Sequence, residues 1–158
     1  MRNLRIDELF IGAWVKRLVP LSDGMFSRPL RVAGLFDNGS MYLDVEDNDG
    51  DPFDAELKDV FPVSIDEVVL RGFGFVRAAK GDNVWMSSFG GIRLTVSLRQ
   101  RHGVYECRRA AITGKVTCWN EEIRYIHELQ SWWRDKVLLP YGVELNLEWR
   151  DRKEKEEF

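Results

Sequence analysis

The sequence has few cysteines, few histidines and no long apolar run. Two of its 158 residues are histidine and two are cysteine. Two cysteines are too few for a disulfide scaffold. No apolar stretch approaches the roughly 20 residues of a membrane-spanning helix. Charged residues interrupt residues 1–15 before the apolar core of a secretory signal can form. These absences predict a cytoplasmic protein without a membrane segment.

Apolar and aromatic residues are plentiful. The chain is 44% hydrophobic and 12% aromatic, with six tryptophans and nine phenylalanines. Burying a handful of such rings contributes on the order of 10 kcal/mol before conformational entropy is subtracted. We therefore expect an ordinary folded core in one compact chain.

Charge is distributed unevenly along the chain. Residues 1–70 hold 7 Lys/Arg against 14 Asp/Glu, a net charge of −7, whereas residues 71–150 hold 13 against 8, a net of +5. The basic half could attract an anionic partner. The simpler interpretation is that the two halves attract each other, within one chain or across a homodimer.

The first part of the chain, residues 1–63, reads as short strands separated by turns. Asp37-Asn38-Gly39-Ser40 is a strong hairpin signal, because Asn-Gly tolerates the positive φ of tight turns. Pro20 to Pro29 reads as a loop. This spacing predicts a small SH3-like antiparallel barrel.

Residues 64–150 predict a second lobe. Ser64 and Glu67 form a capping-box pattern for a linking helix that stops at Gly72. Four candidate strands of a β-meander follow, and a long helix is predicted near 121–138. Alternation over 143–149 predicts a final strand, and 151–158 a charged, flexible tail. The fold class is thus α+β.

Four short motifs stand out along the chain: the opening Leu4–Gly12, the run Phe61-Pro62-Val63-Ser64 through Gly72-Phe73, the helical run Tyr125–Gln130 and the segment Gly142–Leu145. In these four places the chain resembles a family of small uncharacterised proteins common in gut-bacterial genomes and their prophages. Ser131-Trp132-Trp133-Arg134-Asp135 departs from the family pattern, and the acidic loop 44–54 is longer. The resemblance implies a shared fold and a phage or mobile-element context, and it brings no known activity.

The acidic loop suggests calcium. With EF-hand spacing, Asp47, Asp49 and Glu56 fall on ligand positions, but the first position is Val45, which has no side-chain oxygen. The flanks also read as strands, where an EF-hand requires helices. A solvated hairpin loop is the better interpretation, and calcium is the weaker one.

Zinc and nucleophilic catalysis find little support. His102, Cys107, Cys118 and His127 lie further apart than paired zinc ligands usually do. Cys107 and Cys118 could form a disulfide if they faced each other, although the cytoplasm disfavours it. His127 beside an apolar helix face is more typical of packing than of a general base. The sequence therefore predicts no cofactor and favours a binding protein over an enzyme.

The basic meander 71–118 is the predicted binding surface. It holds nine Lys/Arg against Asp82 and Glu106. Guanidinium groups beside aromatic rings on a sheet can bind phosphates and stack bases. The candidate residues for nucleic-acid binding are Arg93, Arg99, Arg101, Arg108 and Tyr105.

Two protein-binding alternatives remain. An SH3-like lobe could bind a peptide through an aromatic groove. The second alternative is self-association through Trp132 or Trp133, since adjacent helix positions diverge by about 100° and one ring could be exposed. The rings available for the groove are Trp14, Phe26, Phe36, Tyr42 and Phe53.

Overall fold

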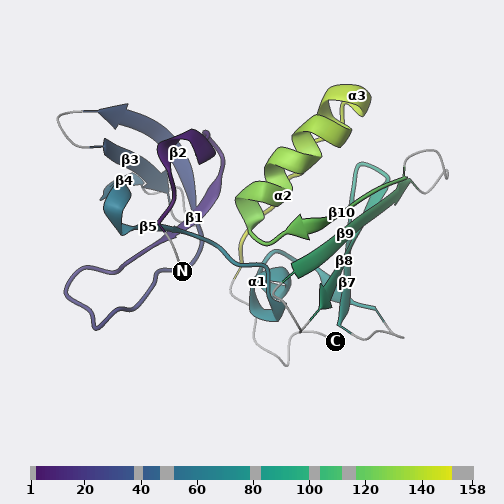
Figure 1. Ribbon diagram of the computed structural model, residues 1–158, viewed down its shortest axis with the longest axis horizontal. Coiled ribbons are helices and arrows are strands. Elements are labelled where there is room, and N and C mark those ends of the chain that lie inside the picture. The colour runs from purple at the N-terminus through teal and green to yellow at the C-terminus, as the bar shows by residue number, and fades with distance from the viewer. Residues whose placement is uncertain are drawn as a thin grey trace. The chain divides into compact units, whose positions relative to one another are not determined.

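The computed structural model of the chain divides into two compact units, Met1–Val63 and Ser64–Phe158. Both units contain a five-stranded antiparallel sheet, and the second adds the main helix (Figure 1). The fold is therefore α+β, as predicted. The described residues are 3–37, 41–46, 52–78, 83–99, 104–111 and 117–150, and within 36–53 and 99–122 the description covers the backbone only.

The sheet of the N-terminal unit has the strand order β4-β3-β2-β1-β5. The last strand returns to pair with the first, while β4 and β5 stand at opposite edges. The predicted barrel is thus not closed in the described part of this unit. The elements are η1 (Ile6–Glu8), β1 (Trp14–Arg17), β2 (Leu30–Asp37), β3 (Met41–Glu46), β4 (Pro52–Glu56), the 3-10 turn η2 (Leu57–Asp59) and β5 (Val60–Pro62).

Small and branched side chains from the strands and the N-terminal segment form the core of this unit. Val15 and Val60 are completely buried on the paired strands β1 and β5. Phe10 and Leu57 pack against the cluster from its border. The cluster comprises Leu4, Leu9, Ala13, Val15, Leu30, Val32, Ala55 and Val60.

The second sheet is a meander with the order β10-β9-β8-β7-β6. Gly90 and Gly91, at φ +52° and +81°, join β7 to β8 in the two-residue turn that requires positive φ at both positions. Strand β8 alternates as a half-buried strand should, since Leu94 and Val96 are buried and Arg93 is exposed. The strands are β6 (Val76–Arg77), β7 (Val84–Phe89), β8 (Ile92–Arg99), β9 (Val104–Ala111) and β10 (Thr117–Ile123).

The main helix begins later than predicted. The backbone of residues 117–123 continues as β10, and helix α2 spans Ile126–Trp133. The Glu128 carboxylate accepts the backbone N–H groups of Arg124 and Tyr125, both at 3.0 Å, which fixes the helix start. A π-helical stretch η3 (Arg134–Leu138) and a last turn α3 (Leu139–Tyr141) extend it beyond the predicted end at 138.

The predicted final strand over 143–149 is wrong. This segment has no regular secondary structure and is held by individual contacts instead. Its Val143 carbonyl accepts from the Trp133 indole N–H at 2.8 Å, and its Trp149 ring lies edge-on to Phe73 at 5.3 Å. The Arg150 amide donates to the Gly72 carbonyl at 2.9 Å. We call residues 143–150 the C-terminal strap.

The linking helix α1 spans Glu67–Gly72, and its cap is not the predicted one. Asp66 accepts the Val69 N–H at 2.8 Å, while Ser64 forms an isolated β-bridge with Tyr125. The helix begins at Glu67, three residues after Ser64, so Ser64 is not its N-cap.

Replacing Asp66 with alanine should therefore lower the free energy of unfolding of this unit by about 1 kcal/mol, the usual cost of a lost N-cap. Chemical denaturation measures the change. Ser64→Ala keeps the backbone bridge and is the matched control, with an expected cost below about 0.5 kcal/mol. The reverse ranking of the two variants would show that Ser64 is the cap.

Candidate interaction site

Within the part of the chain that the structure describes, the connection between β1 and β2 is a distinctive surface feature. It extends from its sheet as a long loop (Figure 1). Its two arms continue the pairing of the strands through an isolated bridge between Leu18 and Phe26. The Val19 amide donates to the Met25 carbonyl at 2.8 Å, and the Ser27 amide donates to the Arg17 carbonyl at 2.8 Å. We call residues 18–29 the 18–29 hairpin.

Ser22 fixes the end of the hairpin. Its hydroxyl donates to the Val19 carbonyl at 2.6 Å and accepts the Met25 N–H at 3.2 Å. Both arms are thereby tied to one side chain, so the loop has a definite shape.

Leu21 at this end has a φ of +61°. The left-handed region is unfavourable for a side chain other than glycine, asparagine or aspartate, because Cβ approaches the following carbonyl. Leucine is therefore a poor choice for stability at this position. Strained backbone of this kind clusters at functional sites, which motivates a functional role for the side chain.

The hairpin exposes apolar side chains. The exposed fractions are 39% for Val19, 108% for Leu21, 66% for Met25 and 38% for Phe26. Eleven large hydrophobic residues are exposed in the described part of the chain, and these four fall within eight consecutive positions. We call them the apolar tip, because single exposed apolar residues are ordinary whereas a cluster marks a contact surface.

The base of the hairpin is aromatic and basic. Phe26 lies edge-on to Phe61 with ring centroids 5.2 Å apart, and the Lys16 Nζ lies 4.1 Å from the centre of the Phe26 ring. The Arg17 amide donates to the Ser27 hydroxyl at 3.1 Å. Ring and cation together hold Phe26 in place at the edge of the apolar tip.

The residues predicted to bind nucleic acid are brought together only in part. Arg93 is exposed on β8, where it pairs with Ala110, and Arg108 pairs with Thr95, two positions along the same strand. Tyr105 pairs with Leu98, which lies an odd number of positions from Arg93 and Thr95 and so falls in the other alternating set of β8. Arg99 ends β8, and Arg101 lies outside the described residues, so binding by this set stays a prediction.

The residues weighed as calcium or zinc ligands lie partly outside the described residues. Among the residues that are described, no group of three or more His, Cys, Asp or Glu could hold a metal ion. Asp47, Asp49 and His102 lie outside those residues, and Glu56 faces the Lys58 ammonium at 3.3 Å.

The cysteines and His127 can also be placed. In the pairing of β9 with β10, Cys107 lies opposite Asn120 and Cys118 opposite Arg109, so the two are diagonal neighbours. Diagonal positions are about 7–8 Å apart, beyond the usual span of a disulfide. His127 is 3% exposed and stacks on Tyr125 with centroids 5.8 Å apart, consistent with packing.

Both tryptophans of the adjacent pair are buried, Trp132 at 8% and Trp133 at 1% exposed. The predicted self-association patch at this pair is therefore wrong. Of the rings assigned to a peptide groove, Trp14 is buried at 5% exposed and Phe26 belongs to the apolar tip. The side chains of Phe36, Tyr42 and Phe53 lie outside the description.

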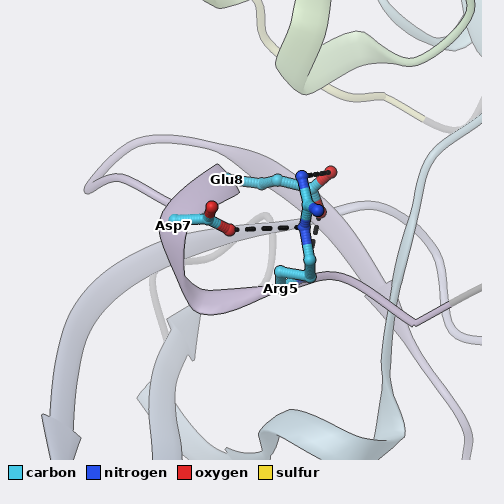
Figure 2. Close-up of polar contacts among 3 residues, drawn as sticks. All are labelled: Arg5, Asp7 and Glu8. Atoms are coloured by element: carbon cyan, nitrogen blue, oxygen red, sulfur yellow. Dashed lines mark hydrogen bonds and ion pairs between the residues drawn. The ribbon is translucent and has the colours of Figure 1, made fainter.

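Arg5, Asp7 and Glu8 form a charged cluster at the start of η1 (Figure 2). The Arg5 Nε lies 3.4 Å from the Asp7 carboxylate and its Nη2 3.8 Å from that of Glu8. Glu8 also accepts the Arg5 backbone N–H at 2.9 Å. These contacts are local and cap a 3-10 turn, and exposed ion pairs of this kind stabilise little.

Sequence reasoning missed the 18–29 hairpin as a site. Prolines and a Ser-Asp-Gly turn marked it as a loop, and loops are usually polar at the surface. The available signal was composition, because Leu21, Met25 and Phe26 stand among the polar and glycine residues between the two prolines.

Comparison of the chain with protein-family models, with curated proteins and with solved structures finds no match in any of the three. Among the described helices, none has the length and apolar character needed to cross a bilayer. Function is therefore inferred from the surface of the chain itself.

Proposed function

We propose that the chain is a non-catalytic interaction module whose N-terminal unit binds another macromolecule through the 18–29 hairpin. The carrying observation is the apolar tip, four exposed apolar side chains on one hydrogen-bonded loop. Covering a fully exposed leucine or methionine contributes roughly 1.5–3 kcal/mol per side chain. That gain is available only when a partner removes these side chains from water.

The shape of the hairpin supports binding. Ser22 and the paired arms hold the loop in place before any partner arrives. A preformed loop loses less conformational entropy on association than a flexible one. A larger share of the contact free energy then appears as binding affinity.

The connectivity of the unit supports an SH3-like scaffold for this role. Strands β1 to β4 form a meander, a 3-10 turn precedes the last strand β5, and that strand pairs with the first. In such small β units the connecting loops commonly carry the binding surface. The resemblance noted from the sequence adds a bacterial or phage context to the proposal.

Site-specific photo-crosslinking tests the proposal. The photoreactive residue p-benzoylphenylalanine replaces Met25 in the full chain, and the matched control carries it at Val68, which is equally exposed at 66% on α1. Irradiation of bacterial cells producing each protein should give a discrete adduct from position 25 and none of the same size from position 68. Identical adducts from both positions, or none from position 25, would contradict the proposed role.

A further inference from the structure

We infer that two copies of the chain exchange their C-terminal straps, so that the Trp149 ring of each copy fills the Gly72 notch of the other. The Gly72 notch is the space over Gly72 that a side chain there would take. This inference goes beyond the proposed function and does not depend on the 18–29 hairpin. Its basis is the fit of the strap, the hinge that precedes it and the apolar side chains beside that hinge.

The strap fits the rest of the C-terminal unit through both its side chains and its backbone. The Trp149 ring occupies the Gly72 notch and meets Phe73 edge-on at 5.3 Å. The Arg150 amide donates to the Gly72 carbonyl at 2.9 Å, and Leu147 is buried. These contacts stay the same whichever copy of the chain supplies the strap, so an exchanged dimer needs no new surface to form them.

The strap is a separate arm that returns along the helix. It leaves after α3, whereas α1 lies at the opposite end of the helix, where the Ile65 amide donates to the Arg124 carbonyl at 3.0 Å (Figure 1). Eight extended residues span about 26 Å, which matches the rise of about 24 Å along a helix from 126 to 141. Residues 143–150 belong to no strand or helix. The strap can therefore leave its own chain without breaking a ladder of backbone hydrogen bonds.

The hinge between the helix and the strap is one glycine. Gly142 has a φ of +71°, and its amide donates to the Leu138 carbonyl at 2.8 Å, which ends the helix in a left-handed residue. The next residue, Val143, already accepts the Trp133 indole N–H at 2.8 Å. Glycine adopts left-handed and extended backbone about equally well, so a change at this residue alone redirects the strap. A hinge this short favours exchange of the segment that follows it.

Two large apolar side chains lie exposed beside the hinge. Leu139 is 73% exposed and Tyr141 is 53% exposed. In a two-fold exchange both straps cross from one copy to the other near the symmetry axis, so the residues next to each hinge meet their copies. The second copy then covers apolar surface that the single chain leaves in water. This burial offsets part of the entropy that association costs.

Sedimentation of the full chain tests the exchange, after refolding from urea over a wide range of protein concentration. The parent should form a dimer whose share rises with concentration. Gly142→Ala should lower the dimer dissociation constant at least tenfold, because alanine disfavours the left-handed hinge in both copies. Gly91→Ala is the matched control, since it puts alanine at a φ of +81° in a turn of the same unit, and it should leave the constant unchanged. Leu139→Ser should raise the constant severalfold.

Photo-crosslinking identifies the shared segment. With p-azidophenylalanine in place of Trp149, irradiation should give covalent dimers in which position 149 is linked to the segment Gly72–Phe73 of the other copy, as mass spectrometry reads. A Gly-Ser-Gly-Ser insertion after Gly142 lets the strap fold back easily, and it should convert these links into links within one chain.

Two results would overturn the exchange. One is a parent and a Gly142→Ala variant that both stay monomeric at every concentration. The other is a dimer in which position 149 is linked only within its own chain, because the copies would then meet through another surface. The sedimentation series leaves Trp149 unchanged, so it decides the question even if the photoreactive ring prevents folding. Neither result affects the test of the 18–29 hairpin at position 25.

Discussion

Replacing Gly72 with alanine is expected to lower the free energy of unfolding of the C-terminal unit by about 3 kcal/mol, a large share of the stability of a small domain. Gly72 is the buried last residue of α1. A Cβ at this position would fall well inside van der Waals contact with the Cζ3, Cη2 and Cε3 carbons of Trp149. Either the ring is expelled from its place or the packing around it is strained.

Both responses lower the free energy of unfolding. Expelling Trp149 removes its edge contact with Phe73 and endangers the hydrogen bond from the Arg150 amide to the Gly72 carbonyl. Large-to-small changes at buried aromatic residues cost about 3–5 kcal/mol, which bounds the loss from above. Overpacking in a close-packed interior costs about 1–3 kcal/mol when the neighbours can shift.

A double-mutant cycle measured by urea denaturation checks this prediction. In a Trp149→Ala background the same Gly72→Ala change should be neutral or slightly stabilising, because the clash is gone and alanine is the better helix former. An equal loss in both backgrounds would show that the ring of Trp149 is not what excludes a side chain at position 72.

Truncating Trp133 to alanine should cost the C-terminal unit about 4 kcal/mol, the range found for buried tryptophan. The side chain is 1% exposed, its ring lies 5.6 Å from that of Phe89 on β7, and its indole N–H donates to the Val143 carbonyl at 2.8 Å. The substitution thus opens a cavity and releases the start of the C-terminal strap at the same time.

Trp133→Phe separates the two contributions. It keeps a ring against Phe89 but leaves the Val143 carbonyl without its donor, so the expected loss is about 1–2 kcal/mol. Thermal or chemical denaturation of the three proteins gives the comparison. If phenylalanine were as damaging as alanine, the hydrogen bond and not the packing would dominate at this position.

Local patterns predicted the sheets well. The Gly-Gly turn after Phe89 and the alternation of β8 depend on residues adjacent in sequence, where steric preference and a period of two are sufficient. The same reasoning failed at helix starts. Glu121 and Glu122 resemble an acidic first turn, yet the backbone there continues β10, because pairing with β9 outweighs a preference of a few tenths of a kcal/mol.

Tertiary placement explains the remaining errors. Apolar and polar residues alternate over 143–149, but this segment makes single contacts to Trp133 and to α1. A strand also needs a neighbouring strand to pair with, and alternation in the sequence does not provide one. Exposure of Leu21 and Met25 likewise depends on how far a loop projects from its sheet, which no local pattern encodes. The exposure that defines the candidate site therefore followed only from the three-dimensional structure of the loop.

The C-terminal strap also bears on biosynthesis. Gly72 and Trp149 are far apart in sequence, so the interior of the C-terminal unit cannot be completed until residue 149 has left the ribosome. The sheet and the described core cluster of the N-terminal unit consist of residues up to Pro62, so all of these residues are present once residue 62 has emerged. During synthesis all residues of the N-terminal unit are therefore available before Trp149, which the C-terminal unit needs for its packing at Gly72.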